Sequence, residues 1–94
     1  MIKSFADSET HAFWQTGKSA KVPPPNLRSV AKRKLDMVNA AARLTDLKIP
    51  PGNRLHALKD DRLGQHAIWI NDQYRVCFTW KDGDAYDVEI TDYH

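Results

Sequence analysis

The chain has 94 residues and a net charge of +2, with 41% hydrophobic and 28% charged residues, which is typical of a globular protein. This length excludes a dinucleotide-binding domain, a TIM barrel or two independent cores. No apolar run exceeds four residues and no hydrophobic stretch follows the first methionine, so we expect neither a transmembrane helix nor a signal peptide. The single cysteine, Cys77, cannot form an internal disulfide, and we expect a cytoplasmic protein.

The small net charge hides an uneven distribution. Residues 1–66 carry twelve Lys or Arg against six Asp or Glu, whereas residues 67–94 carry two against six. A basic part followed by an acidic part indicates either an anionic partner, such as a nucleic acid, or simply two differently charged solvated surfaces. The charge pattern alone leaves both interpretations open.

The first forty-odd residues predict a short strand and two helices. Residues 1–6 favour a strand, and residues 10–16 favour a short helix that begins after the capping side chains of residues 7–10 and ends at Gly17. A loop with three consecutive prolines follows. Asn26 is expected to cap a longer helix over residues 27–43, with one buried face made by Leu27, Val30, Ala31, Leu35, Val38 and Ala42.

The pattern then changes to strands. After one more helical turn near residues 45–47, which Pro50 ends, residues 53–58, 66–70 and 74–80 favour strands. A turn at residues 81–84 leads to a last strand with Tyr86, Val88 and Ile90 on its apolar side. This order predicts an α+β fold, a small antiparallel β-sheet with two N-terminal helices packed on one face.

A candidate site follows from the strand over residues 74–80. Val76, Phe78 and Trp80 point to one side and Arg75 points to the other. If the last strand lies alongside, the loop after His56 and the final Asp92, Tyr93 and His94 converge with Arg75. Acid, base, cations and an aromatic ring suit RNA cleavage without a metal, because a base removes the 2′-hydroxyl proton, an acid protonates the leaving 5′-oxygen, and cations stabilise the phosphorane.

Each of these residues also has a plain structural interpretation. Arg75 can pair with a nearby acid, a histidine in a strand is often structural, and chain ends often fray. Other sites are not indicated: the glycines are scattered, the histidines lack zinc-ligand spacing, and we expect neither a metal nor a cofactor.

Several segments nevertheless occur together in one known family. These are residues 1–5, 50–55, 58–59, 64–66, 70–78 and 88–90, with Arg62 and the terminal Asp92, Tyr93 and His94. On these segments the whole chain, residues 1–94, resembles a single RelE/HigB-like toxin domain, a HigB-type toxin of the RelE superfamily, also called plasmid maintenance killer proteins. The resemblance implies the RelE-like microbial RNase fold. The chain departs from some members at Asp60, where they have glycine.

The resemblance also implies a function: the toxin of a type II toxin–antitoxin system. Such a toxin is a ribosome-dependent, metal-independent endoribonuclease that cleaves mRNA in the A site and inhibits translation and growth. The implied partners are a HigA-like helix-turn-helix antitoxin, the ribosome with its 16S rRNA, and mRNA, while operator DNA is contacted only through the antitoxin and no membrane is involved. The alternative is a non-catalytic module of this fold that occupies the ribosome or serves as a co-repressor. A third possibility is a small scaffold protein.

Carried over residue by residue, the family's active-site positions fall on His56, Lys59, Arg75, Asp92, Tyr93 and His94. Arg75 would bind the scissile phosphate, and Lys59 would be a second cation. His56 and His94 would transfer protons, and Asp92 would orient them or act as base. Tyr93 would position a nucleobase. The general base stays open among them. The basic side chains of the second helix and the loop before it would contact ribosomal RNA: Lys18, Lys21, Arg28, Lys32, Arg33 and Lys34.

Overall fold

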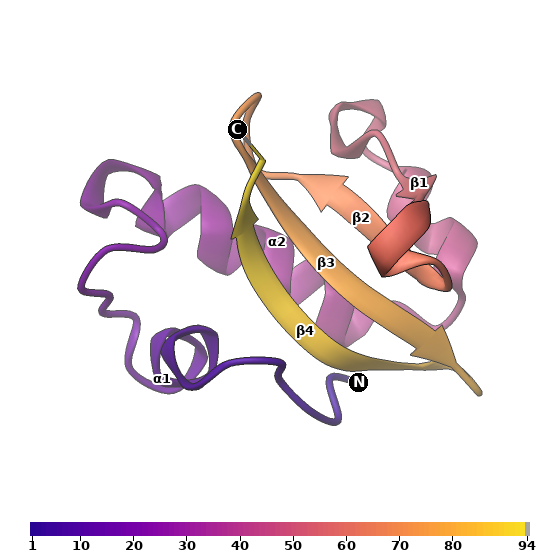
Figure 1. The fold of residues 1–94 in the computed structure, drawn as a ribbon, viewed down its shortest axis with the longest axis horizontal. Helices are drawn as coiled ribbons and strands as arrows, with labels where there is room; N and C mark the ends of the chain where they lie inside the picture. The colour runs from indigo at the N-terminus through magenta and orange to yellow at the C-terminus, as the bar shows by residue number, and fades with distance from the viewer. Residues whose placement is uncertain (94) are drawn as a thin grey trace.

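The computed structural model describes residues 1–93, which form two α-helices and a four-stranded antiparallel sheet in the order β1-β2-β3-β4 (Figure 1). One-turn 3-10 segments occupy the connections. The helices are α1 (Ser8–Thr16) and α2 (Arg28–Ala40), and the strands are β1 (His56–Ala57), β2 (Gln65–Trp69), β3 (Tyr74–Lys81) and β4 (Asp84–Asp92). The α+β prediction is confirmed.

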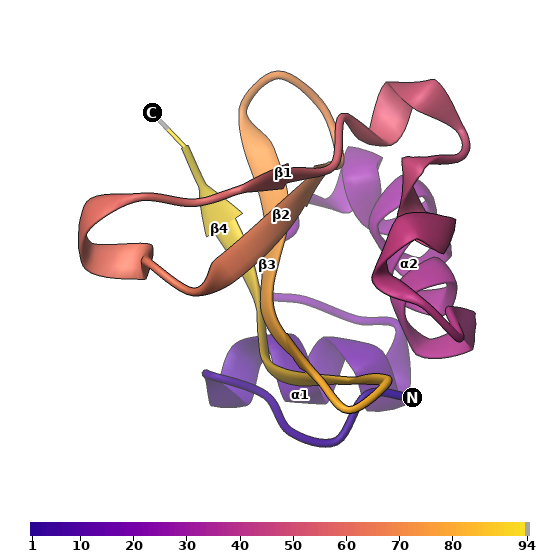
Figure 2. The same ribbon diagram turned by 90° about the vertical axis from the view of Figure 1, so that its right-hand side faces the viewer.

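The helices and the sheet enclose one main core. Helix α2 lies along one face of the sheet, while the connection between β1 and β2 extends on the side away from it (Figure 2). Side chains from both helices and from three strands are fully buried between these layers, and they include Phe13, Leu35, Val38, Ile68, Val76, Phe78 and Val88. The two N-terminal helices therefore pack on one side of the sheet and leave the other side open.

Both helices differ at their ends from the prediction. Helix α1 begins at Ser8, two residues earlier than predicted, and ends at Thr16 as predicted, where Gly17 takes the left-handed conformation with φ 74°. Helix α2 spans residues 28–40 rather than 27–43, because Asn26 belongs to a separate 3-10 turn and caps nothing through its side chain. Ala41 is already extended, so Ala42 lies exposed outside the helix instead of on its buried face.

The amino-terminal segment runs beside β4 without becoming a full strand. Two isolated parallel bridges, Ile2 to Ala85 and Phe5 to Val88, hold it there, and the backbone N–H of Val88 donates to the carbonyl of Ser4 at 3.0 Å. This segment covers part of the β4 edge, which would otherwise expose unpaired backbone groups.

A β-bulge in β4 corrects one predicted face. Between the pairs Cys77–Glu89 and Thr79–Tyr86, β4 holds one more residue than β3, and Asp87 in this bulge has φ 52°. An extra residue reverses the alternation of side chains. Ala85, rather than Tyr86, therefore shares the core face with Val88.

Candidate active site

The face of the sheet turned away from α2, called here the open face, carries part of the predicted site. Its side chains are fixed by register: Trp69 of β2 pairs with Arg75 of β3, which pairs with Thr91 of β4. Because strands alternate their side chains, Tyr93 falls on the same face as Thr91. The prediction that the last strand lies beside the strand of Arg75 is confirmed.

Arg75 is held rigidly at the centre of this arrangement. It is only 8% exposed, and its Nη1 donates to the carbonyl oxygens of Asn71 at 2.6 Å and Tyr74 at 3.2 Å. The guanidinium carbon lies 3.8 Å from the Trp69 ring centroid and 5.4 Å from that of Tyr93. Burial lowers the pKa of Arg75 from its usual value, although an arginine still stays protonated at neutral pH. The structure thus presents a fixed planar cation between two aromatic rings.

The end of β4 separates the predicted residues. Tyr93 is 40% exposed and its backbone N–H donates to the carbonyl of Gln73 at 2.7 Å, which fixes it beside β3. Asp92 pairs with Tyr74 and accepts a hydrogen bond from Nε2 of Gln73 at 3.2 Å, so it lies on the other side of β4 from Tyr93. Tyr93 therefore joins Arg75 and Asp92 does not. His94 lies outside the described residues.

His56 lies at the far edge of the open face. It pairs with Ala67 of β2, which pairs with Cys77 of β3, so His56 is two strand spacings, about 10 Å, from the β3 backbone. Its exposed ring donates an Nδ1–H hydrogen bond to the carbonyl of Arg54 at 2.9 Å, because a carbonyl can only accept. This bond leaves Nε2 of the neutral ring free to take up a proton.

The connection between β1 and β2 overhangs the same face. Leu58 packs on Ala67 and Cys77, and Lys59 follows as an exposed residue at the start of the overhang. Arg62 anchors the other end of the connection: it donates to Gln65 at 3.0 Å and pairs with Glu89 at 3.0 Å. Beside this anchor is an open hollow of about 480 Å³, lined by Asp61, Arg62, Leu63, Gln65 and Thr79.

Asp60, where some members of the resembled family have glycine, adopts φ 55°. This is the left-handed region that glycine enters without steric cost. The departure from the family pattern is therefore accommodated without a change to another backbone region.

Two residues of the open face were missed at the sequence level. Arg54, just before β1, places its guanidinium carbon 4.2 Å from the Trp69 ring centroid, on the ring that also contacts Arg75. The second missed residue is Trp69. Its sequence signal was its position next to Ile68 in β2, because neighbouring residues of a strand point to opposite faces and Ile68 points into the core. The pairing of Trp69 with Arg75 depends on register, which the sequence pattern left undetermined.

The predicted RNA-contacting set lies away from Arg75, on and before α2, and one member is wrongly assigned. Lys34 is 8% exposed and donates from Nζ to Oδ1 of the fully buried Asn53 at 2.6 Å. Burial, followed by the neighbouring Arg33, lowers its pKa. Its position on the helix faces the turn that holds Asn53, so Lys34 is a structural residue and does not present its charge to a partner.

The remaining basic residues of this set reach the surface to different degrees. Arg33 is exposed, as are Lys18 and Lys21 in the preceding loop. Lys32 pairs with Asp36 at 2.6 Å and lies over the Trp14 ring, while Arg28 is tied to Ser19 by hydrogen bonds from Nε and Nη2. These cations lie on the helical side of the molecule, opposite the open face.

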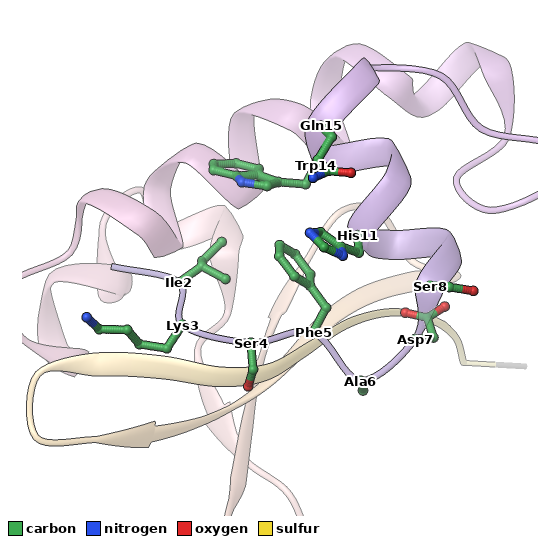
Figure 3. Close-up of a pocket in the computed structure, with 10 residues that line it drawn as sticks. All are labelled: Ile2, Lys3, Ser4, Phe5, Ala6, Asp7, Ser8, His11, Trp14 and Gln15. Atoms are coloured by element: carbon green, nitrogen blue, oxygen red, sulfur yellow. The ribbon is translucent and has the colours of Figure 1, made fainter.

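A second hollow, of about 540 Å³, lies between the amino-terminal segment and α1 (Figure 3). The rings of Phe5 and His11 stack there with centroids 4.8 Å apart, and Trp14 and Lys3 also line it. Of the predicted active-site residues that the structure describes, none lines this hollow. Over residues 1–93, no group of three or more His, Cys, Asp or Glu side chains is arranged to hold a metal ion, and none of the helices is long and apolar enough to cross a membrane.

The fold defines the class to which the chain is related. A solved YoeB–YefM complex from Staphylococcus aureus contains a chain that matches this one with a TM-score of 0.61 at 12% identity, covering 100% of this chain and 98% of that chain. Such a likeness concerns the fold alone, and the fold is RelE-like.

The family follows from the sequence. Residues 3–94 match the family described as the RelE-like toxin of type II toxin–antitoxin system HigB, and the chain belongs to this family. It is 36% identical over 85 residues to Toxin HigB-1 of Vibrio cholerae, covering 90% of each chain. It is also 31% identical over 94 residues to Endoribonuclease HigB of Proteus vulgaris, covering 100% of each chain.

Proposed function

We propose that this protein is a ribosome-dependent endoribonuclease that cleaves mRNA in the ribosomal A site and thereby arrests growth. The observation that carries the proposal is the environment of Arg75. Its guanidinium group donates to two backbone carbonyls and lies beside the rings of Trp69 and Tyr93 on the open face of the sheet. The likeness to a protein named as an endoribonuclease supports the reaction type. The A site and the cytoplasm are where such an activity would operate.

The proposed reaction is attack of a ribose 2′-oxygen on the adjacent phosphorus. The 2′-hydroxyl loses its proton to a base, the P–O5′ bond breaks, and the 5′-oxygen takes a proton from an acid, which leaves a 2′,3′-cyclic phosphate and a 5′-hydroxyl. Arg75 stabilises the extra negative charge on the phosphorane, because two guanidinium N–H groups match two phosphate oxygens. No metal is needed for these steps.

The roles of the other residues follow from where they lie. His56 is the described residue best prepared to accept the proton, since its Nδ1–H is engaged by the Arg54 carbonyl and Nε2 is free. Lys59, exposed at the start of the overhang, supplies a second cation. Tyr93, which is 40% exposed and lies beside Arg75, would stack on a base. His94 and Asp92 remain candidates from the resemblance, Asp92 as an orienting group.

The test uses purified ribosomes programmed with a defined mRNA. The ribosomes are first crosslinked so that they stay assembled, and cleavage is then measured in buffer with and without EDTA. We expect a 2′,3′-cyclic phosphate end at the A site, unaffected by chelation, and no comparable cleavage of the same mRNA without ribosomes. Arg75→Ala should lose cleavage by a factor of about 10² to 10³, the effect of removing one preorganised donor at a developing anion. Full growth arrest by a folded Arg75→Ala variant would favour ribosome occupation instead.

Two partner contacts belong to the same proposal. A HigA-like helix-turn-helix antitoxin should bind the chain, relieve its arrest, and make any operator contact itself. The exposed Lys18, Lys21 and Arg33 should contact 16S rRNA, together with the partly buried Lys32 and Arg28.

The rRNA contact is tested by charge reversal. Lys21→Glu combined with Arg33→Glu should weaken sedimentation with ribosomes, whereas the exposed Arg43→Glu should have a smaller effect. Equal sedimentation of the unaltered protein, the double variant and Arg43→Glu would contradict the rRNA contact without affecting the proposed cleavage chemistry.

A further inference from the structure

The open face carries a row of alternating cations and aromatic rings that crosses the whole sheet. Arg54 precedes β1, Trp69 is in β2, Arg75 is in β3 and Tyr93 follows β4, which is the order of the strands in space (Figure 1). The guanidinium carbons of Arg54 and Arg75 lie 4.2 and 3.8 Å from the Trp69 centroid. Arg54 directly precedes β1 and Arg75 is in β3, and β2 lies between these two strands, so along the sheet Trp69 lies between the two arginines.

This row brings two positive charges close together. The sum of the two distances to Trp69, about 8 Å, is the largest separation that the guanidinium carbons can have. Neither arginine has a carboxylate within ion-pair distance in the described part of the chain, residues 1–93. Burial is the main cause of the lowered pKa of Arg75; Tyr93 and Asp72 oppose it, and the charge of Arg54 adds a smaller lowering effect. Such a pair of cations is complementary to an anion with more than one charged group.

The backbone at Arg54 is shaped to make this contact. Arg54 has φ 48°, a left-handed conformation that costs a non-glycine residue about 1–2 kcal/mol. The preceding Asn53 is fully buried and holds Lys34, Leu47 and Ile49 by hydrogen bonds, so the turn that aims Arg54 is anchored in the protein interior. The Arg54 side chain itself remains exposed.

We propose that Arg54 and Trp69 form an RNA-backbone subsite beside the scissile phosphate. Arg54 binds the neighbouring phosphate of a single-stranded RNA, and Trp69 is a positioning residue that holds both guanidiniums at a separation comparable with that of consecutive phosphates. The subsite tracks charge and spacing and reads no base. This inference rests on the proposed function in one respect, namely that the scissile phosphate lies at Arg75.

The experiment measures binding of a fluorescein-labelled 2′-O-methyl oligonucleotide, which cannot be cleaved, by anisotropy over a series of KCl concentrations. Arg54→Gln should lower affinity roughly tenfold at low salt and reduce the slope of log K against log salt by about 0.7, the value for one phosphate of a single strand. The exposed Arg43→Gln is the matched control and should change neither. An unchanged slope in Arg54→Gln, or no measurable binding by the unaltered protein, would overturn the subsite.

Trp69 is tested by rescue. Trp69→Leu should lower affinity at least as much as Arg54→Gln, because both guanidiniums lose their platform, and Trp69→Phe should recover part of the loss since a ring is restored. In ribosome-programmed cleavage, Arg54→Gln should raise KM more than it lowers kcat. Equal binding by the Leu and Phe variants would contradict the positioning role.

The outcomes separate this inference from the nuclease proposal. If the unaltered protein cleaves mRNA but Arg54→Gln keeps its salt slope, the subsite fails and the nuclease stands. If Arg54 sets the slope but no cleavage occurs on ribosomes, the nuclease fails and the phosphate subsite stands.

Discussion

The buried contact between Lys34 and Asn53 gives the most quantitative prediction about stability. Asn53 is fully buried, accepts from Lys34 Nζ at 2.6 Å, and donates from Nδ2 to the carbonyl of Leu47 at 3.2 Å. Asn53→Ala removes the acceptor of an ammonium group and the donor to a carbonyl. A hydrogen bond to a charged group contributes about 1.5–3 kcal/mol, and the flexible lysine stem can recover some hydration, so we expect a loss of about 2–3 kcal/mol in the free energy of unfolding.

The contact can be isolated with a double-mutant cycle. Lys34→Met should destabilise by about 1–2 kcal/mol, and the combination with Asn53→Ala should cost less than the sum by at least about 1 kcal/mol. Lys32→Met is the matched control on the same helix: its exposed pair with Asp36 is worth about 0.3–0.5 kcal/mol. Urea unfolding followed by far-UV circular dichroism measures all four variants. A loss below about 0.5 kcal/mol in Asn53→Ala, with no coupling, would refute the reasoning.

Three further predictions concern the overhang and the sheet beneath it. Cys77 is fully buried, and burial raises the pKa of its thiol, so the thiolate is scarce near pH 8. A disulfide reagent such as DTNB should therefore react with Cys77 only at the rate of unfolding, and rapid reaction would contradict this. Asp60→Gly should stabilise the protein by up to about 1 kcal/mol because φ is 55°, whereas the neighbouring Asp61→Gly should destabilise it, as thermal unfolding would show. Arg62→Gln removes the half-buried ion pair with Glu89, so it should lower the free energy of unfolding by about 1 kcal/mol and increase proteolysis of the connection between β1 and β2. Unchanged proteolysis would show that this ion pair does not hold the connection in place.

The parts of the fold that the sequence predicts well are those set by local periodicity. The alternation around Val76 and Phe78 identified the core face of β3, and therefore also the face of Arg75. Gly17 marked the end of α1 because only glycine adopts the left-handed conformation without cost. The resemblance then supplied residue roles that no periodicity can provide.

The errors arose where distant parts of the chain decide the structure. The bulge at Asp87 reverses one face of β4 although an aspartate carries no strong signal for φ 52°. Lys34 occupies a position that looks solvent-facing on an isolated helix, and only the turn nineteen residues later buries it. The contact of Trp69 with Arg54 and Arg75 depends on strand register, which a period of two leaves undetermined.

The central claim, cleavage of translated mRNA through Arg75, is tested most directly by mapping transcript 5′ ends in growing cells. The chain would be expressed without its antitoxin, on a reporter mRNA with an intact or a deleted start codon, beside an Arg75→Ala variant shown to fold by circular dichroism. We predict new 5′ ends within the translated frame, their loss without the start codon, and their loss with growth restored in Arg75→Ala. Growth arrest without new ends, or with the same ends in Arg75→Ala, would contradict the account.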